Sequence, residues 1–97
     1  MDQPGKHYFM YVLLCADQTL YCGFTDDVFR RLKTHQAKKG AKYTRVASRH
    51  PLQLIYYAEY ATKREALQAE ARFKRLTRVQ KEDYLQKHGV KLFHKLG

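Results

Sequence analysis

The first run of apolar positions predicts a pair of strands near the N-terminus. Residues 8–15 are almost all aromatic or aliphatic, which is typical of a strand buried on both faces. Residues 16–18 form a short polar break, and residues 19–23 return to a strand pattern. The two segments therefore predict a β-hairpin.

Helix-start signals organise the rest of the chain. Residues 25–27 (Thr-Asp-Asp) supply N-cap chemistry, and two later Thr-x-x-Glu/Gln segments, at 62–65 and 77–80, are capping boxes. Gly40 and Gly89 are the expected stops. The predicted elements after the hairpin are a helix from about 28 to 39, a basic loop over 41–50, a strand over 52–60, and helices over 62–76 and 77–89.

This order of elements, β-β-α-β-α-α, predicts an α+β fold in which helices flank a three-stranded antiparallel sheet. At 97 residues the chain is long enough for one modest core and too short for two. We expect a flexible lead-in over 1–7, one domain over 8–89, and a tail over 90–97 that is either a short strand or a frayed end. The candidate core residues are Val12, Leu14, Leu20, Val28, Leu32, Leu54, Ile55, Leu67 and Phe73.

Two tyrosines in the hairpin, Tyr11 and Tyr21, stand ten residues apart. With a two-residue loop their side chains would lie on opposite faces of the sheet. A three-residue loop over 16–18 would pair Cys15 with Thr19 and place both tyrosines on one face. Such a loop favours a left-handed residue at its end, where this chain has glutamine, so both geometries remain open.

The first predicted helix separates its two adjacent arginines. At about 100° per residue, Val28, Phe29 and Leu32 define the expected buried stripe. Arg30 then points into solvent, whereas Arg31 falls at the border of the stripe. His35 lies one turn after Arg31, beside the same stripe.

A single carboxylate, Glu70, lies in the middle of the second predicted helix. Apolar residues stand a turn before and a turn after it, so the carboxylate is expected to be partly buried, which is costly without a partner. Two partners remain open. One is a divalent metal ion, and the other is an ion pair with Lys74 four residues later.

The charge distribution suggests a polyanionic partner. The formal net charge is +10, and no acidic residue occurs between Asp27 and Glu59. A solvated basic face without a specific partner is the alternative, and a membrane surface is disfavoured because the segment lacks an apolar face. The basic residues of this stretch are Arg30, Arg31, Lys33, Lys38, Lys39, Lys42, Arg45 and Arg49.

Nucleic acid is the expected partner, since residues 40–45 interleave cations with an aromatic ring and a hydroxyl, as phosphate contacts and base stacking require. Two cysteines are too few for a disulfide framework, no apolar run approaches about 18 residues, and no export leader is evident, so we expect a cytoplasmic protein. The histidines lack zinc-site spacing. The candidate nucleic-acid-binding residues are Lys38, Lys39, Lys42, Tyr43 and Arg45.

The residues now described resemble the GIY-YIG nuclease family. The two triplets that name the family correspond to residues 10–12 (Met-Tyr-Val) and 21–23 (Tyr-Cys-Gly). Arg31, His35 and Glu70 match the downstream positions of the family motif, and residues 40–45 are similar to its small stand-alone bacterial branch. Met10 departs from the usual glycine, and Phe24 stands where some relatives carry a lysine.

The resemblance implies hydrolysis of DNA phosphodiester bonds with one divalent metal ion, Mg²⁺ or Mn²⁺. Glu70 would bind the metal, Arg31 would neutralise the phosphate, and either Tyr11 or Tyr21 would deprotonate or align water. A tyrosine acting as the base would need help from the metal, Arg31 or His35. Candidate substrates include single-stranded and branched repair intermediates. A separate expectation is a protein partner that confers specificity on the nuclease. The alternative is a non-catalytic module that binds DNA or RNA on the same fold.

Overall fold

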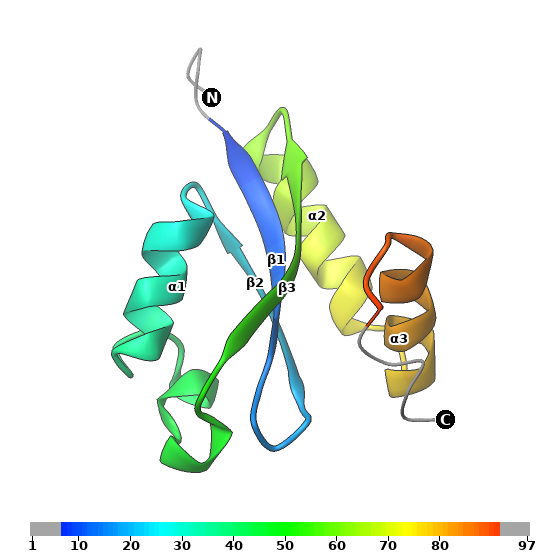
Figure 1. Cartoon of the computed structure of the whole chain (residues 1–97). Coiled ribbons are helices and arrows are strands. Elements are labelled where there is room, and N and C mark those ends of the chain that lie inside the picture. The colour runs from blue at the N-terminus through cyan, green and yellow to red at the C-terminus, as the bar shows by residue number, and fades with distance from the viewer. Residues whose placement is uncertain (1–6, 92–97) are drawn as a thin grey trace.

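The computed structural model describes residues 7–91 and has the predicted α+β architecture (Figure 1). The expected lead-in and tail lie mostly outside these residues, although Val90, at the start of the expected tail, packs into the core. The elements are β1 (Tyr8–Leu14), β2 (Leu20–Thr25), α1 (Val28–Gln36), the 3₁₀ turns η1 (Lys42–Arg45) and η2 (Ala47–Arg49), β3 (Gln53–Tyr60), α2 (Lys63–Lys74) and α3 (Arg78–Lys87).

The sheet is antiparallel with strand order β2-β1-β3, so the most apolar strand lies in the centre. Helix α1 covers one face, and α2 and α3 lie on the other side of the sheet (Figure 1). This arrangement explains the continuous apolar run of β1, because both sets of alternating side chains are buried. No helix among residues 7–91 is long and apolar enough to cross a membrane.

Two buried clusters, one on each face, follow this alternation. On the α2 side, Met10, Val12 and Cys22 pack with Ala69, Phe73 and Leu85. On the α1 side, Tyr11, Leu13 and Cys15 pack with Val28 and Leu52.

The hairpin adopts the three-residue loop. The backbone amide of Cys15 donates to the Thr19 carbonyl over 2.9 Å, and Leu13 pairs with Tyr21. Gln18 takes the left-handed conformation with φ of 70°, although it carries a side chain. Tyr11 and Tyr21 therefore lie on the same face of the sheet.

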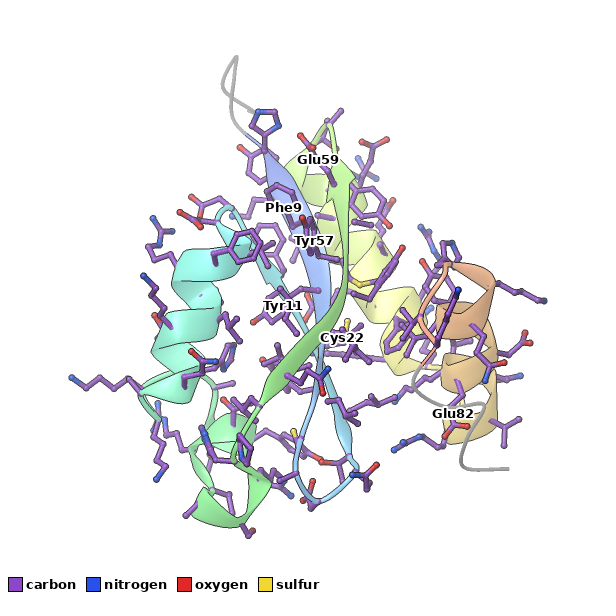
Figure 2. All side chains as sticks on the ribbon, in the orientation of Figure 1. Phe9, Tyr11, Cys22, Tyr57, Glu59 and Glu82 are labelled. Atoms are coloured by element: carbon purple, nitrogen blue, oxygen red, sulfur yellow. The ribbon has the colours of Figure 1, made fainter. Side chains whose placement is uncertain are left out.

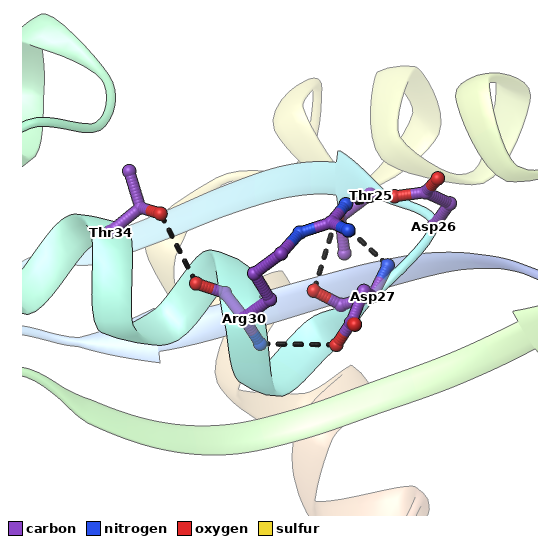
Figure 3. Close-up of polar contacts among 5 residues, drawn as sticks. All are labelled: Thr25, Asp26, Asp27, Arg30 and Thr34. Atoms are coloured by element: carbon purple, nitrogen blue, oxygen red, sulfur yellow. Dashed lines mark hydrogen bonds and ion pairs between the residues drawn. The ribbon is translucent and has the colours of Figure 1, made fainter.

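The capping signals are confirmed, and they fix where each helix begins. Thr62 and Thr77 each close a capping box, with Glu65 and Gln80 respectively. The Asp27 side chain accepts a hydrogen bond from the Arg30 amide over 3.0 Å (Figure 3). Because α1 begins immediately after Asp27, the orientation of every later side chain on the helix is set at this point.

Three details differ from the sequence prediction. Phe29 is 59% exposed and Leu67 is 42% exposed, so neither is a core residue. The buried stripe of α1 is centred on Val28, Leu32 and His35 instead, which leaves Phe29 on the flank of the helix, edge-to-face with Tyr57. Helix α1 also ends at Gln36 rather than near Lys39, and the expected basic loop contains two 3₁₀ turns.

Candidate active site

A hydrogen bond between Tyr11 and His35 forms the centre of the candidate site. The Tyr11 hydroxyl lies 2.6 Å from His35 Nε2, and both side chains are almost completely buried. Tyr11 comes from the central strand and His35 from the last turn of α1, so the bond joins the sheet to the helix above it. In Figure 2, Tyr11 lies between the sheet and α1, whereas Cys22 lies toward α2.

Two glycines make room for this pair. A Cβ atom on Gly23 would lie 2.5 Å from the Tyr11 hydroxyl oxygen, and one on Gly40 would lie 2.5 Å from His35 Nδ1. Neither position has a positive φ. Both glycines are therefore explained by close approach of a site side chain rather than by backbone conformation.

Tyr21 lies beside the Tyr11–His35 pair. Its ring centroid is 6.3 Å from that of Tyr11 and 5.3 Å from that of His35. Tyr43 stacks on Tyr21 at 5.9 Å, and the Lys74 ammonium lies 5.9 Å from the Tyr21 ring centroid. Contacts from four elements, β1, α1, η1 and α2, thus hold Tyr21 at the β2 edge of the sheet.

Arg31 interacts with the same group of side chains. The guanidinium interacts with the Tyr11 hydroxyl and acts electrostatically on Tyr21 and His35. Arg30 is different, because its guanidinium pairs with Asp26 at 2.7 Å on the exposed side of α1. Figure 3 shows Arg30 beside Asp26 and the N-cap residue Asp27. The predicted separation of the two arginines is therefore observed.

Glu70 on α2 completes the group. Its side chain is 18% exposed and pairs with Lys74 at 2.8 Å, which was one of the two arrangements left open by the sequence. The Glu70 charge acts on both Tyr21 and Cys22, so the carboxylate faces β2. Residues 7–91 contain no group of three or more acidic, histidine or cysteine side chains that could hold a metal.

A single carboxylate nevertheless suits one hard divalent cation. Mg²⁺ retains several waters and is commonly bound by one or two carboxylates together with substrate phosphate oxygens. Lys74 shows that a cation is already accommodated at the Glu70 carboxylate, and its half-exposed side chain can move aside. The residues present therefore fit a metal that is bound jointly by Glu70 and the substrate.

Burial opposes charge on the two central groups. Desolvation raises the pKa of Tyr11 to about 12, although the adjacent Arg31 acts in the opposite direction. Desolvation and then the charge of Arg31 lower the pKa of His35 to about 4. Burial also raises the pKa of Tyr21, while Lys74 and Arg31 oppose that rise. The resting site thus holds a neutral phenol and a neutral imidazole at pH 7.

The neutral His35 makes the folded state sensitive to acid. An unfolded histidine takes up a proton near pH 6.5, whereas folded His35 resists protonation down to about pH 4. Stability is fully present above pH 6.5 and falls as the pH drops toward 4, by at most about 3 kcal/mol from this group.

Urea unfolding at several pH values between about 7 and 4.5 measures this effect. We expect His35→Gln to flatten the dependence, while the matched change at exposed His88, His88→Gln, leaves it as steep as in the parent. Equal slopes for the parent and His35→Gln would contradict the assignment.

The predicted nucleic-acid-binding residues fall into two groups. Lys38, Lys39 and Lys42 are exposed, next to the site. Tyr43 stacks on Tyr21, and the Arg49 guanidinium lies over the Tyr43 ring, 3.7 Å from its centroid. Arg45 is exposed, but its Nε donates to the Gly40 carbonyl over 3.0 Å. The three exposed lysines can therefore contact phosphate, whereas Tyr43 and Arg45 also make contacts within the protein that stabilise the segment around them.

Sequence reasoning missed one member of the site, Thr44. Its hydroxyl oxygen lies 2.6 Å from His35 Nδ1, and the residue is fully buried inside the basic segment. The sequence gives no periodic signal for this contact, since Thr44 lies in a short 3₁₀ turn surrounded by exposed cations.

Known proteins share both the sequence and the fold. The chain is 61% identical over 87 residues to a UPF0213 protein from Lactiplantibacillus plantarum, covering 90% of this chain and 86% of that protein. A UPF0213 protein from Limosilactobacillus reuteri is 59% identical, with 91% and 92% covered. A solution NMR structure of a protein from E. faecalis has a TM-score of 0.60 at 46% identity and covers 94% of each chain.

The family match spans most of the described fold. Residues 7–83 match the family described as the GIY-YIG catalytic domain, and this range contains every side chain of the candidate site. The relatives of nearly equal length carry the UPF0213 name. The chain therefore belongs to the GIY-YIG family, and the relatives named above are small bacterial UPF0213 proteins.

Proposed function

We propose that this protein is a metal-dependent endonuclease that hydrolyses DNA phosphodiester bonds. The observation that carries the proposal is the buried Tyr11–His35 hydrogen bond, with the Arg31 guanidinium beside the phenol and the Glu70 carboxylate at the same sheet edge. A protein that only binds nucleic acid has no need of a buried hydroxyl–imidazole pair next to a phosphate-binding cation.

Arg31 binds the scissile phosphate in this proposal. A guanidinium offers several N–H donors, so it can hold phosphate oxygens and neutralise the charge that develops during attack. Glu70 holds the divalent metal, Mg²⁺ or Mn²⁺, which when bound polarises the phosphate and stabilises the leaving oxygen. Lys74 is displaced from the carboxylate and remains available to the substrate.

Tyr11 aligns the attacking water and passes its proton to His35. A phenol with a pKa of about 12 rarely ionises on its own at pH 7. The hydrogen bond to Nε2 avoids a free phenolate, because the phenol accepts a proton from water as it gives its own to the imidazole. Phosphate bound at Arg31 would neutralise one of the charges that lower the pKa of His35, so substrate binding favours the transfer.

Tyr21 positions the reacting groups instead. Its ring packs against Tyr11, His35 and Tyr43, and its hydroxyl end lies near the Glu70–Lys74 pair. We assign it to hydrogen bonding with water or phosphate between the metal and the base.

The two departures from the family pattern leave the site intact. Met10 is 1% exposed and packs on the α2 side, away from Tyr11, so it does not crowd the phenol. Phe24 is paired with Met10 and stacks on Tyr8. Burial raises the pKa of Tyr21, and the positive charge of Lys74, beside the Tyr21 ring, opposes that rise. These features favour the nuclease over a non-catalytic binding module.

We expect Lys39 and Lys42 to supply part of the DNA affinity through phosphate contacts. The double change Lys39→Ala with Lys42→Ala should weaken binding and lower the slope of log affinity against log salt, by about 1.4 for single strands or about 1.8 for duplex. Fluorescence anisotropy in EDTA measures both without cleavage. Lys87→Ala, which removes an exposed cation from α3, is the matched control. An unchanged salt slope would locate the DNA elsewhere.

A cleavage assay tests the function directly. Labelled single-stranded, duplex and branched DNA are incubated with Mg²⁺, Mn²⁺ or EDTA at equal ionic strength. Metal-dependent products would support the proposal and would rank the substrates. We propose that the natural substrates are repair intermediates and that the protein acts in the cytoplasm. Binding without cleavage on every DNA and with both metals would favour the binding module, and stimulation by lysate fractions would reveal a specificity partner.

A further inference from the structure

We propose that Thr44 is a positioning residue that fixes the tautomer of His35, so that the imidazole presents a proton acceptor to Tyr11. The proposal rests on the proposed function only for its effect on cleavage, because the tautomer itself can be observed without any substrate. It gives the basic segment around Thr44 a second task beside binding phosphate.

A backbone carbonyl determines which atom donates in each hydrogen bond of this chain of contacts. Thr44 Oγ1 lies 3.0 Å from the Ala41 carbonyl oxygen and 2.6 Å from His35 Nδ1. A carbonyl oxygen can only accept, and a hydroxyl has one proton. Thr44 therefore donates to Ala41 and must accept from His35, which places the imidazole proton on Nδ1.

This tautomer leaves the other ring nitrogen unprotonated. His35 Nε2 can then accept the Tyr11 hydroxyl proton over 2.6 Å. The reverse tautomer would turn two acceptors toward each other at Ala41 and would make Nε2 a donor. All three side chains are at most 2% exposed, so water cannot readily replace a lost partner.

The consequence for the reaction is a proton acceptor in the correct place. As water attacks phosphorus, its O–H bond breaks and a new O–H bond forms at Tyr11. The original Tyr11 proton moves to His35 Nε2, giving an imidazolium with protons on both nitrogens, while the bond from phosphorus to the leaving oxygen breaks. The leaving oxygen keeps the bonding electron pair and takes a proton from solvent. Return of the proton through Tyr11 to solvent restores the resting site. With Nε2 already protonated, the first transfer has no acceptor.

The surrounding segment holds Thr44 firmly in place. His50 Nε2 lies 2.7 Å from the Thr44 carbonyl oxygen, and Arg49 donates to the Tyr43 carbonyl over 3.0 Å. The Gly40 backbone packs directly against His35 Nδ1, and Arg45 donates to the Gly40 carbonyl. These contacts anchor the backbone of η1, so the Thr44 hydroxyl has a defined position relative to α1.

The experiment combines NMR of ¹⁵N-labelled histidine with the cleavage assay. The chemical shifts and proton couplings of the two ring nitrogens identify the tautomer. We expect the Nδ1–H form in the parent, loss of that preference in Thr44→Val, and cleavage reduced about 10- to 100-fold. Thr44→Ser, which keeps the hydroxyl, should restore both. Thr34→Val is the matched control, since the Thr34 hydroxyl donates to the Arg30 carbonyl and serves a helix instead.

Two outcomes would overturn the proposal. One is a parent protein whose His35 carries its proton on Nε2, a result that needs no variant to fold. The other is a folded Thr44→Val protein with parental tautomer and parental cleavage. A parent that shows the Nδ1–H form and a variant that loses it, with no DNA cut by either, would support the positioning role and refute the nuclease.

Discussion

Glu70→Ala is expected to reduce metal-dependent DNA cleavage by roughly a thousandfold while DNA affinity in EDTA stays within about twofold of the parent. In the proposed function Glu70 is the residue that holds the metal, and its charge acts on Tyr21, so its loss removes the metal site. Folding should be little affected, because an ion pair with a half-exposed lysine contributes about 0.3–0.5 kcal/mol. Cleavage rates and anisotropy on the same DNA measure the two effects.

A matched control separates the metal site from a general loss of acidity. Glu82 also forms an intrahelical pair, with Arg78, and its side chain is 30% exposed. Glu82→Ala should cleave like the parent, and Glu70→Gln, which keeps the shape without the charge, should fail like Glu70→Ala. Parental cleavage by Glu70→Ala would show that the metal is bound by other residues.

Arg31→Met is expected to lower cleavage by about 10²- to 10³-fold and to raise the pKa of His35. The first effect follows from loss of the phosphate-binding cation. The second follows because the Arg31 charge is one of the causes that lower this pKa to about 4, and desolvation, the larger cause, remains. The pKa should therefore rise without reaching its ordinary value of about 6.5. NMR titration of the imidazole measures the shift.

Arg30→Met controls for net charge and helix composition at the neighbouring position. Arg30 pairs with Asp26 on the exposed side of α1 and does not contribute to the His35 shift. The variant should leave both cleavage and the His35 pKa unchanged, apart from a small loss of DNA affinity. Equal effects of the two substitutions would indicate that general positive charge, rather than a placed guanidinium, acts on the phosphate.

The sequence alone determined the element order and the helix starts. Those features depend on local chemistry, namely the Thr62 and Thr77 capping boxes, the Asp27 cap and the apolar run of β1. The different exposures of Arg30 and Arg31 also followed from helical periodicity. Periodicity failed at Phe29, because the sequence could not show that polar His35, rather than an aromatic ring, completes the buried stripe.

Only the tertiary structure decided how the site is assembled. The hairpin register depended on whether Gln18 would adopt a left-handed conformation. The local preference of glutamine disfavours that conformation, and strand pairing across the sheet compensates for the cost. The need for glycine at 23 and 40 appeared once the Tyr11 and His35 side chains were placed against them. Thr44 became part of the site because an irregular segment folds back on α1, and contacts of that kind leave no period in a sequence.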